Sequence, residues 1–389
     1  MSNLGLYITI SYYDALSTLR VYNVWIFIPP VSYAILMETD SIDNVIITGG
    51  TGFFGLHACN HLSSQDVNVT AVDINPFQES DDIEDVEFAK GDVRNAELMR
   101  KVIRHADAVI HAASAIPTWN ETEIKNAIVD GTQTVLQAAQ RNSVDRVVYI
   151  SSAAVYGRRD RQPMTESTEL RPRSLYGRAK LEAEEVCREY RANGMCVPIV
   201  RPQALIGRQR LGVFQILFDW VHTGATIPLI GTGNNKYQLL HVEDLISAID
   251  LLLTANKDQV NTEFNVGATK FNDMKKDFQS LIDYAGTGKQ VIGTPAFLAI
   301  WSLRALNFFN LSPLYPSLYE TASEDTYLNV EKLKSIGWEP DYSNREALVD
   351  TFEWYRANYV AGKSERGIGN RTAPDQKALL LVKKLFQMI

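Results

Sequence analysis

The most constraining feature of this chain is a glycine-rich turn between an apolar run and a helix-like segment. The run Val45–Thr48 leads into three spaced glycines, Gly49, Gly52 and Gly55. In a strand–turn–helix unit, such a turn presents backbone N–H groups and a helix N-terminus to a pyrophosphate. The first glycine permits the tight turn, the second lets the backbone approach the phosphates, and the third lets the helix pack on its strand. The sequence therefore predicts a dinucleotide site.

An acidic residue stands at the position that completes such a site, about 20 residues beyond the turn. Asp73 ends the second apolar run, Val67–Val72. A carboxylate there accepts hydrogen bonds from the adenosine ribose hydroxyls and repels a 2′-phosphate. The next residues, 74–77, contain no Arg or Lys that would hold such a phosphate. We therefore expect NAD rather than NADP.

The composition is that of an ordinary globular protein and excludes other classes. Of the 389 residues, 46% are apolar and 22% are charged, which suits one large α/β domain with a smaller lobe. The net charge of −8 argues against non-specific nucleic-acid binding, which needs a basic face. Cys59, Cys187 and Cys196 show no metal-ligand spacing and cannot all pair. We interpret them as packing residues of a protein in a reducing, cytoplasmic compartment, and we expect no metal site.

The N-terminal extension, residues 1–43, is expected to lie outside the core fold. Residues 1–36 carry very few charges, and Val21–Leu36 is nearly all apolar. That stretch is shorter than the roughly 20 residues that span a bilayer, and two adjacent prolines interrupt it. It also lacks the basic start and the cleavage site of a secretory signal. We interpret Met37 as the natural start; a membrane anchor and an ordered packing arm are the alternatives.

From Asn44 onward, strand-like and helix-like segments alternate, which predicts a parallel sheet covered on both faces. The expected strands are Val45–Thr48, Val67–Asp73, Val86–Lys90, Ala108–His111, Arg146–Ser151 and Cys196–Arg201. The expected helices are Gly55–Ser63, Ala96–Arg104, Glu121–Arg141 and Ser174–Asn193. The fold class is therefore α/β, a Rossmann-type doubly wound parallel sheet over residues 44–203 with a smaller mixed α/β lobe after it.

Beyond residue 203 the regular alternation fades. Residues 204–362 mix short strands and helices, as expected for a substrate lobe from which some elements return to the first domain. In the tail, residues 363–389, the segment Lys377–Ile389 has the pattern of an amphipathic helix. We interpret this helix as docked on its own domain, with contact to a membrane or a partner as the alternative.

Three polar residues indicate a reaction type. Ser152 follows the fifth expected strand, so its hydroxyl lies at the carboxyl edge of the sheet, where ligands bind. Tyr176 and Lys180 are four apart on an expected helix and therefore share a face. A free phenol, with a pKa of about 10, is a poor base, but a nearby ammonium and an oxidised nicotinamide favour the phenolate and lower that pKa. Lys180 can also hold the nicotinamide ribose, while Ser152 can hydrogen-bond the substrate oxygen whose charge changes during hydride transfer.

Together these motifs resemble those of the extended short-chain dehydrogenases/reductases, over roughly residues 44 to 359. That group contains nucleotide-sugar epimerases and dehydratases and the 3β-hydroxysteroid dehydrogenase-like enzymes. The resemblance implies that Ser152, Tyr176 and Lys180 form a catalytic triad. It implies an NAD-binding set made of Gly49, Gly52, Phe53, Phe54, Gly55, Asp73, Asp92, Val93, Ala112, Ala113, Ser114, Tyr176, Lys180 and Gln203.

The resemblance also implies roles for four segments. Asp92, in Gly91–Val93, would meet the adenine amino group, and His111–Ser114 would line the cofactor at the end of the fourth strand. Arg201–Gln203 would lie near the nicotinamide amide. His241–Asp244 matches a helix-entry motif that we interpret as structural, since an acid such as Asp244 is stabilising near a helix start.

The chain departs from the group's pattern at three places. Ile128 stands where the helix after the fourth strand usually carries Asn, and Asn126 would point to a different side of that helix. Ala204 stands where sugar-nucleotide enzymes often have an Asn that contacts substrate. The Arg-bearing loop that commonly grips a nucleotide diphosphate is replaced by Thr294–Pro316, which is longer and more apolar and which we expect to form a buried helix rather than a lipid-binding wall.

Three functions follow as hypotheses. The first is an NAD-dependent epimerase-type oxidoreductase acting on a nucleotide sugar; Ala153 and Ala154 offer no acid/base pair, which disfavours dehydration. The second is a 3β-hydroxysteroid dehydrogenase-like oxidoreductase of an apolar alcohol. The third is a non-catalytic NAD-binding scaffold, which has no need of an activated phenol. The resemblance also implies a homodimer formed through a four-helix contact of residues 121–141 and 174–193.

Overall fold

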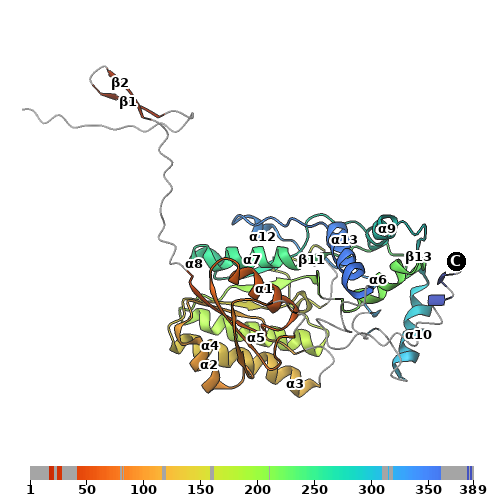
Figure 1. Ribbon diagram of the computed structural model, residues 1–389, viewed down its shortest axis with the longest axis horizontal. Helices are drawn as coiled ribbons and strands as arrows, with labels where there is room; N and C mark the ends of the chain where they lie inside the picture. The colour runs from red at the N-terminus through yellow and green to blue at the C-terminus, as the bar shows by residue number, and fades with distance from the viewer. Residues whose placement is uncertain are drawn as a thin grey trace, which may run out of the picture. The chain divides into compact units, whose positions relative to one another are not determined.

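A computed structural model describes residues 17–21, 24–28, 42–78, 81, 83–115, 120–157, 162–209, 211–308, 314, 319–360, 383–384 and 386–387. The chain divides into two compact units, Met1–Ser41 and Ile42–Ile389. In the first unit, β1 (Ser17–Val21) pairs antiparallel with β2 (Val24–Ile28). Met37 and most of the apolar stretch before it lie outside the described residues. The second unit holds all the other described elements (Figure 1).

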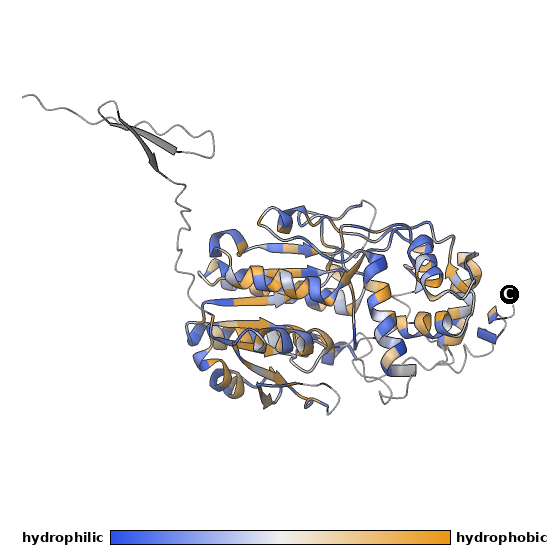
Figure 2. Cartoon of the chain, turned by 45° about the horizontal axis from the view of Figure 1, so that its top comes forward, coloured by the Kyte–Doolittle hydropathy of each residue, from blue (hydrophilic) through white to orange (hydrophobic). Residues whose placement is uncertain are grey.

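A seven-stranded parallel sheet forms the centre of the second unit, in the order β12-β8-β7-β6-β3-β4-β5. Its strands are β3 (Asn44–Thr48), β4 (Asn68–Asp73), β5 (Val86–Lys90), β6 (Ala108–His111), β7 (Arg146–Ile150), β8 (Ile199–Pro202) and β12 (Glu263–Val266). Every residue of β6 and β7 is buried, as expected for parallel strands covered on both faces. Figure 2 shows hydrophobic residues along these strands. The six predicted strands are confirmed, and β12 is added at the edge beyond β8.

One strand begins later than predicted. The sequence pattern placed its start at Cys196, whereas β8 begins at Ile199. Cys196 forms only an isolated bridge with Arg146, and Pro198 has no N–H with which to continue a ladder. All three cysteines are free and buried, which confirms that they are packing residues.

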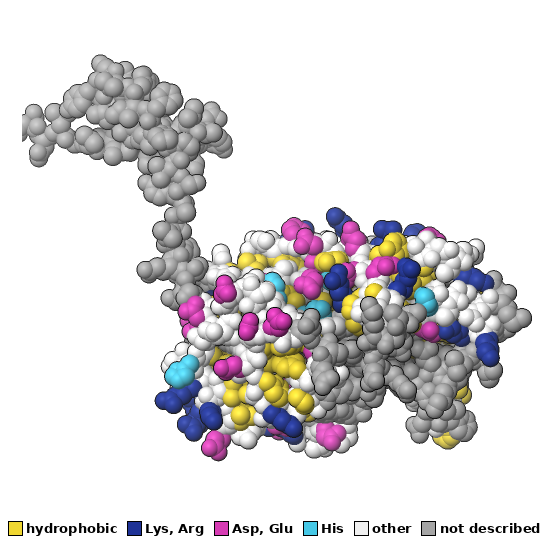
Figure 3. Space-filling view, in the orientation of Figure 1, with side chains coloured by type: hydrophobic (Ala, Val, Ile, Leu, Met, Phe, Trp, Pro, Cys, Tyr) yellow, Lys and Arg dark blue, Asp and Glu magenta, His cyan; other side chains and the backbone are white. Residues whose placement is uncertain are grey.

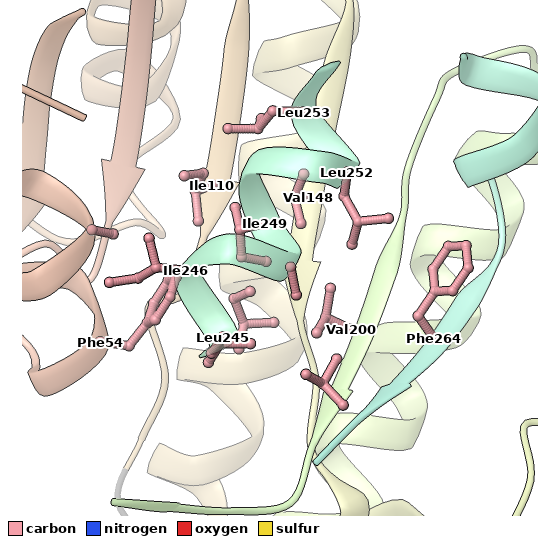
Figure 4. Close-up of a cluster of buried hydrophobic side chains, with 14 of the residues drawn as sticks. Phe54, Ile110, Val148, Val200, Leu245, Ile246, Ile249, Leu252, Leu253 and Phe264 are labelled. Carbon is pink, nitrogen blue, oxygen red and sulfur yellow. The ribbon is translucent and has the colours of Figure 1, made fainter. Parts of the chain in front are cut away.

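Helices cover both faces of the sheet. On one face lie α1 (Phe53–Ser63) and α7 (Val242–Thr254). Figure 4 shows side chains of α7, among them Leu245, Ile249 and Leu252, near Val148 and Val200 of the sheet, and all five belong to one buried cluster. The other face carries the remaining helices of this half: α2 (Ala96–Val102) with the 3₁₀ turn η2 (Ile103–His105), α3 (Glu121–Lys125), the π-helical segment η3 (Asn126–Asp130), α4 (Gly131–Arg141) and α5 (Leu175–Ala192). The predicted helix 121–141 is therefore continuous in α3, η3 and α4.

The second lobe packs around its own hydrophobic cluster, to which Phe218, Trp220, Leu281 and Phe352 belong. Its strands form two parallel pairs: β9 (Ala204–Ile206) with β11 (Leu239–His241), and β10 (Ile227–Ile230) with β13 (Val291–Thr294). Its main helices are α6 (Phe214–His222), α9 (Met274–Ala285), α10 (Ala296–Phe308) and α13 (Asn344–Trp354). The π-helical η5 (Tyr355–Val360) also belongs to this lobe. Three short elements, η4 (Ala153–Val155), α8 (Lys257–Val260) and α12 (Glu331–Lys334), have their buried residues in the cluster of the central sheet instead.

The expectation of a buried helix within Thr294–Pro316 is wrong. That segment forms α10, and none of the side chains of α10 is buried. Hydropathy alone indicates burial for such a sequence, but burial also requires other elements to cover the helix, and several residues of α10 are only half-buried while the rest are exposed. Most of the segment after Phe308 lies outside the described residues.

The described residues of the C-terminal helix contact their own domain. Lys383 Nζ lies 2.5 Å from Asp219 Oδ2 of α6, and the backbone N–H of Thr226 donates to Phe386 O at 3.0 Å. The Phe386 ring packs against Trp220, with the ring centroids 6.1 Å apart. These contacts agree with the interpretation of a docked helix. Within the described parts of the chain, we find no helix with the length and apolar character to cross a membrane.

Candidate active site

The glycine turn lies where β3 ends, and its backbone is locked to the neighbouring strands. Gly49 has a φ of +73° and donates its N–H to Val72 O at 2.8 Å. A Cβ at this position would lie 2.7 Å from the backbone N of Ala113, which follows β6. Only glycine therefore fits here, because the turn needs a left-handed residue and a close approach to the next strand.

The turn leads into α1 through a cap that has no side chain. Gly52 is the N-cap residue, and the first turn of α1 carries no acidic residue. A Cβ on Gly55 would collide with Gly49 O, so this glycine lets the helix pack against the turn. Phe53 and Phe54 point into the core and are almost fully buried, so their part in a phosphate site rests with their backbone. The positive end of the helix dipole is thus left for an anion.

Asp73 lies beside this turn. It ends β4, one residue after Val72, which pairs with Thr48 of β3. Its carboxylate accepts a hydrogen bond from Asn75 N at 3.1 Å. The predicted acid and the glycine turn therefore occupy the carboxyl ends of adjacent strands.

The other residues predicted to hold the cofactor have different environments. Asp92 is bound by Arg94, whose Nη2 lies 2.5 Å from Oδ2, and this hydrogen-bonded partner lowers the pKa of the Asp92 carboxyl. Val93 is buried in the core, whereas Ser114 is exposed and its hydroxyl donates to Ala115 O at 3.3 Å. Ala112 lies against the glycine turn together with Ala113.

A buried chain of hydrogen bonds links β3, β6 and α4 near the turn. It was not predicted from the sequence. The Thr132 hydroxyl donates to Ile128 O at 2.6 Å and therefore accepts from His111 Nε2–H at 3.0 Å. The other ring nitrogen, Nδ1, then accepts from the Thr48 hydroxyl at 2.6 Å. Burial, with the charge of Lys180 as a second cause, lowers the pKa of His111 to about 3. The histidine is consequently neutral and fixes the end of β6 against β3 and α4.

Ser152, Tyr176 and Lys180 lie at the ends of β7 and α5. Ser152 follows β7 and caps η4, where its Oγ accepts from Ala154 N at 3.1 Å. Lys180 donates from Nζ to Ile150 O at 2.7 Å, and the same Nζ lies 5.9 Å from the centroid of the Tyr176 ring. The helix periodicity thus brings the lysine and the tyrosine to the same side of α5, facing the end of β7.

Two features set the position of the first turn of α5. Ser174 is the N-cap residue, and its Oγ accepts from Gly177 N at 3.0 Å. A Cβ on Gly177 would lie 2.6 Å from Ala154 O, so the absence of a side chain lets the helix contact η4. This contact places the turn that holds Tyr176 beside the segment that Ser152 caps.

Lys180 is unusual because it is almost fully buried. Burial lowers the pKa of its ammonium to about 7, while the carboxylate of Glu184 acts in the opposite direction. An amine with a pKa near neutrality can change its charge in response to a neighbouring phenol or ligand.

A buried ion-pair network connects α5 to the central sheet. Ser151 donates to Glu184 Oε1 at 2.6 Å, and Arg201 binds both oxygens of Glu184, at 2.9 Å and 2.6 Å. Arg201 also donates to the Tyr156 hydroxyl at 2.9 Å, and Tyr156 donates to Asn265 Oδ1 at 2.6 Å. Arg201 therefore joins β8 to α5, η4 and β12. The sequence reasoning did not recognise the partners of Arg201, because they are distant in the chain.

The remaining residue of the predicted set, Gln203, is buried between the two halves of the unit. Its Nε2 donates to Thr326 O at 3.3 Å, and its Oε1 accepts from Ala204 N at 3.1 Å. The side chain thereby fixes the chain where β8 leads into β9.

Comparisons with known proteins agree with this geometry. A family model described as the NAD dependent epimerase/dehydratase family matches residues 45–267. The chain belongs to this family.

It is 33% identical to y4nG, an uncharacterized protein of Sinorhizobium fredii, over 90% of this chain and 87% of that protein. It is 26% identical to a putative UDP-glucose 4-epimerase of Methanocaldococcus jannaschii, over 81% of this chain and 99% of that protein. It is also similar to the crystal structure of DesIV, a dTDP-glucose 4,6-dehydratase from Streptomyces venezuelae with NAD and TYD bound, with a TM-score of 0.65 and 25% identity over 82% of this chain and 98% of that one.

Membership of the NAD dependent epimerase/dehydratase family confirms the predicted resemblance and identifies the chain as an NAD-dependent enzyme. The residues present fit the cofactor, because Gly49 and Gly55 let the turn pack closely against neighbouring backbone and the N-terminus of α1 lacks a competing side-chain cap. The structure also agrees with the structural interpretation of the helix-entry motif. Asp244 is buried and accepts from the backbone N–H groups of Asp341 and Tyr342, at 2.7 Å and 3.2 Å.

The departures from the family pattern have local explanations. Ile128 is buried in the core on η3, so an apolar side chain is accommodated where the family usually has Asn. Asn126 lies at the start of the same π-helical segment. Ala204 begins β9 and is half-buried against the lobe cluster.

Proposed function

We propose that this protein is an epimerase-type oxidoreductase of a nucleotide sugar in which Tyr176, Lys180 and Ser152 act together on one hydroxyl-bearing carbon. The observation that carries the proposal is the position of Lys180. Its Nζ is buried, bound to Ile150 O, and close to the Tyr176 ring. The related proteins named above include a putative UDP-glucose 4-epimerase and a dTDP-glucose 4,6-dehydratase, which supports a nucleotide sugar as the substrate.

Each side chain has a distinct part in the proposed reaction. The Tyr176 phenolate accepts the proton of the substrate hydroxyl, and the ammonium of Lys180 stabilises that phenolate. The Ser152 hydroxyl donates a hydrogen bond to the same substrate oxygen as it becomes a carbonyl. NAD would supply reversible hydride acceptance at that carbon when bound. Gly49, Gly52, Gly55 and Asp73 would hold the pyrophosphate and the adenosine ribose.

We propose epimerisation rather than dehydration. A dehydratase needs an acid/base pair next to the serine, and this chain has Ala153 and Ala154 there. Ala153 is buried in the core, so the position also offers no room for a carboxylate. With no carboxylate on η4 to remove water, the residues present support return of the substrate to an alcohol at the same carbon.

We also propose a homodimer and a cytoplasmic location. The homodimer would form through α3, α4 and α5. Within one chain, α3 lies beside α5, with Lys125 Nζ 3.0 Å from Glu182 Oε2. A cytoplasmic location is supported by the three free, buried cysteines.

The test compares Tyr176→Phe with Tyr190→Phe, a matched change on the same helix. The Tyr190 hydroxyl accepts from Gln133 Nε2 at 2.8 Å and is remote from Lys180 in the sequence of α5. With a panel of UDP- and dTDP-hexoses, we expect Tyr176→Phe to lower turnover by about 100-fold or more, while Tyr190→Phe stays within a few-fold of the wild type. NAD-induced thermal stabilisation should persist in both variants.

Two outcomes would contradict the proposal. Equal turnover of Tyr176→Phe and the wild type would remove the tyrosine from the reaction. Net NADH formation from hydrophobic alcohols, with no conversion of any nucleotide sugar, would instead favour the apolar-alcohol oxidoreductase, whose specific support is the apolar segment around α10.

A further inference from the structure

The helix α10 carries the most exposed group of large hydrophobic side chains in the described part of the chain. Phe297, Leu298, Trp301 and Phe308 are 64%, 54%, 67% and 82% exposed. The other large hydrophobic residues with comparable exposure, Ile74 and Tyr284, are isolated and less exposed. Contiguous apolar surface of this kind marks an interaction site in soluble proteins.

These side chains share one face of the helix. Phe297, Trp301 and Phe308 are separated by four and seven residues, and Ala305 lies between the last two, so they form one stripe along α10. On the opposite side, Ala299 and Leu303 are only half-buried. Apolar residues thus surround much of the helix, and the stripe is its most exposed side.

The N-terminal end of the helix follows directly from a strand that is anchored in the lobe. Thr294, the last residue of β13, donates from Oγ1 to Leu229 O at 2.7 Å and accepts from Gly231 N at 3.0 Å. Beyond that anchor, α10 projects from the end of the lobe near the C-terminal segment (Figure 1). Figure 3 shows hydrophobic atoms at the far end of this projection.

We propose that α10 is the membrane-contacting element of this protein, inserting its outer stripe into the interfacial region of a lipid bilayer. Three arguments favour a bilayer. One side of α10 is already half-buried, so a single flat apolar surface is enough to cover the exposed stripe. Trp and Phe are residue types found on the apolar side of helices that lie in the interface, and Arg304 supplies a cation at the edge of the stripe. With 13 residues, α10 is about 20 Å long, too short to span the roughly 30 Å hydrocarbon core, so it lies along the surface.

The surface is too small for a stable contact with a second copy of the chain. A face about 20 Å long and about 10 Å wide on each copy would bury well below the roughly 1,200 Å² of a stable protein interface. A bilayer has no such requirement, because adsorption grows with each apolar side chain that leaves water.

The charges around the stripe suit lipid headgroups. Arg304 is the charged residue of α10, and its Nη2 lies 2.9 Å from Glu320 Oε1. Its guanidinium lies 5.9 Å from the Trp301 ring, at the edge of the stripe, where it can reach headgroup phosphates while its stem stays on apolar surface. The same end of the lobe carries Lys289, whose Nζ binds Gln387 O at 2.9 Å, and the exposed Lys384.

The first test measures co-sedimentation of the full chain with phosphatidylcholine vesicles, with and without phosphatidylglycerol. We expect Trp301→Ser to lower the bound fraction at least fivefold and Phe297→Ser/Trp301→Ser to abolish binding. Tyr284→Ser is the control, because it removes an exposed aromatic side chain from α9 rather than from the stripe. It should leave binding within twofold of the wild type. Because the substituted side chains are exposed, the NAD-induced thermal shift should be the same in every variant, which verifies the fold.

The second test places a probe on the stripe. The three native cysteines are buried, so Ala305→Cys can be labelled selectively with an environment-sensitive fluorophore. Vesicles should shift the emission to shorter wavelength, and brominated lipid should quench it.

Three results would overturn the proposal. The wild type could show no binding to either vesicle type. Binding could persist unchanged in the double variant and disappear when residues 1–41 are removed, which would assign it to the N-terminal unit. The probe could shift with protein concentration in the absence of lipid, together with a doubled mass, which would assign α10 to a contact between copies.

Discussion

Lys180 is a charged side chain in a place where charged side chains are rarely found. It is 2% exposed, and burial lowers the pKa of its ammonium to about 7 from an ordinary value of 10.5. Holding it there destabilises the folded protein, because the charged form is favoured by water. The protein compensates with the hydrogen bond to Ile150 O and with the nearby Glu184. The proposed function accounts for this position, because there Lys180 stabilises the Tyr176 phenolate even though its burial lowers the stability of the folded protein.

This burial leads to a pH-dependent prediction for Lys180→Met. Between about pH 7 and pH 10.5, the unfolded wild type binds more protons at this lysine than the folded protein does. The stability of the wild type relative to Lys180→Met should therefore rise as the pH rises from 7 to 10, and should be constant below pH 7. Urea unfolding of both proteins at pH 6, 7, 8.5 and 10 measures the difference. A difference that does not vary with pH would show that the buried ammonium is not responsible.

Gly49 and Gly286 provide a matched pair for the glycine turn. Both have left-handed backbones, with φ of +73° and +68°, but a Cβ on Gly286 would meet nothing within 4 Å. We expect Gly286→Ala to cost about 1 kcal/mol in the free energy of unfolding, which is the conformational penalty alone. Gly49→Ala should cost more, because the backbone of Ala113 must also move, and it should weaken the thermal shift caused by NAD. Equal losses in the two variants would mean that the contact with Ala113 does not matter.

At the scale of elements, the network around Glu184 fixes α5 to the sheet. Glu184 is fully buried and holds Ser151, which follows β7, and Arg201 of β8. The helix that carries Tyr176 and Lys180 is thus tied to the strand end that carries Ser152. A buried ion pair adds little net stability by itself, but it is costly to break once it is formed.

Glu184→Gln should accordingly destabilise the protein by about 3–5 kcal/mol, since the guanidinium of Arg201 would stay buried without a counter-charge. Glu185→Gln is the control. Glu185 is the next residue on α5, and its ion pair with Arg188 is exposed, so its loss should stay within about 1 kcal/mol. Chemical denaturation of the two variants and the wild type gives the comparison. A small effect at Glu184 would indicate that Arg201 finds another partner or that water enters.

What the sequence predicts and what it misses can be explained at this same scale. The six strands and the glycine turn were predictable because their signals are local, in the apolar runs and in the spacing of Gly49, Gly52 and Gly55. The hydrogen-bonded chain through His111 was not, because Thr48 and Thr132 meet it only after strands distant in the sequence are paired. The exposure of α10 was missed for a different reason: hydropathy indicates which residues avoid water, and it does not indicate what covers them.

At the scale of the whole molecule, the two halves of the second unit are built from interleaved chain. The sheet is not finished when β8 ends, because its outermost strand, β12, comes from the region beyond α7. Asn265 on that strand also accepts the hydrogen bond of Tyr156. The strand escaped prediction because Glu263–Val266 lies in the region beyond residue 203, where the regular alternation of strand-like and helix-like segments has faded.

The placement of β12 has a practical consequence for anyone who wishes to isolate the cofactor-binding half. A fragment that stops after Gln203 would leave the edge of β8 open, with its backbone donors and acceptors unpaired and Val200 stripped of its cover. Open edges of this kind recruit other chains, so the fragment should aggregate during expression. A fragment made by fusing β12 and α7 back onto residues 42–203 through a flexible linker should instead stay in solution and still bind NAD, as light scattering and thermal shift can show.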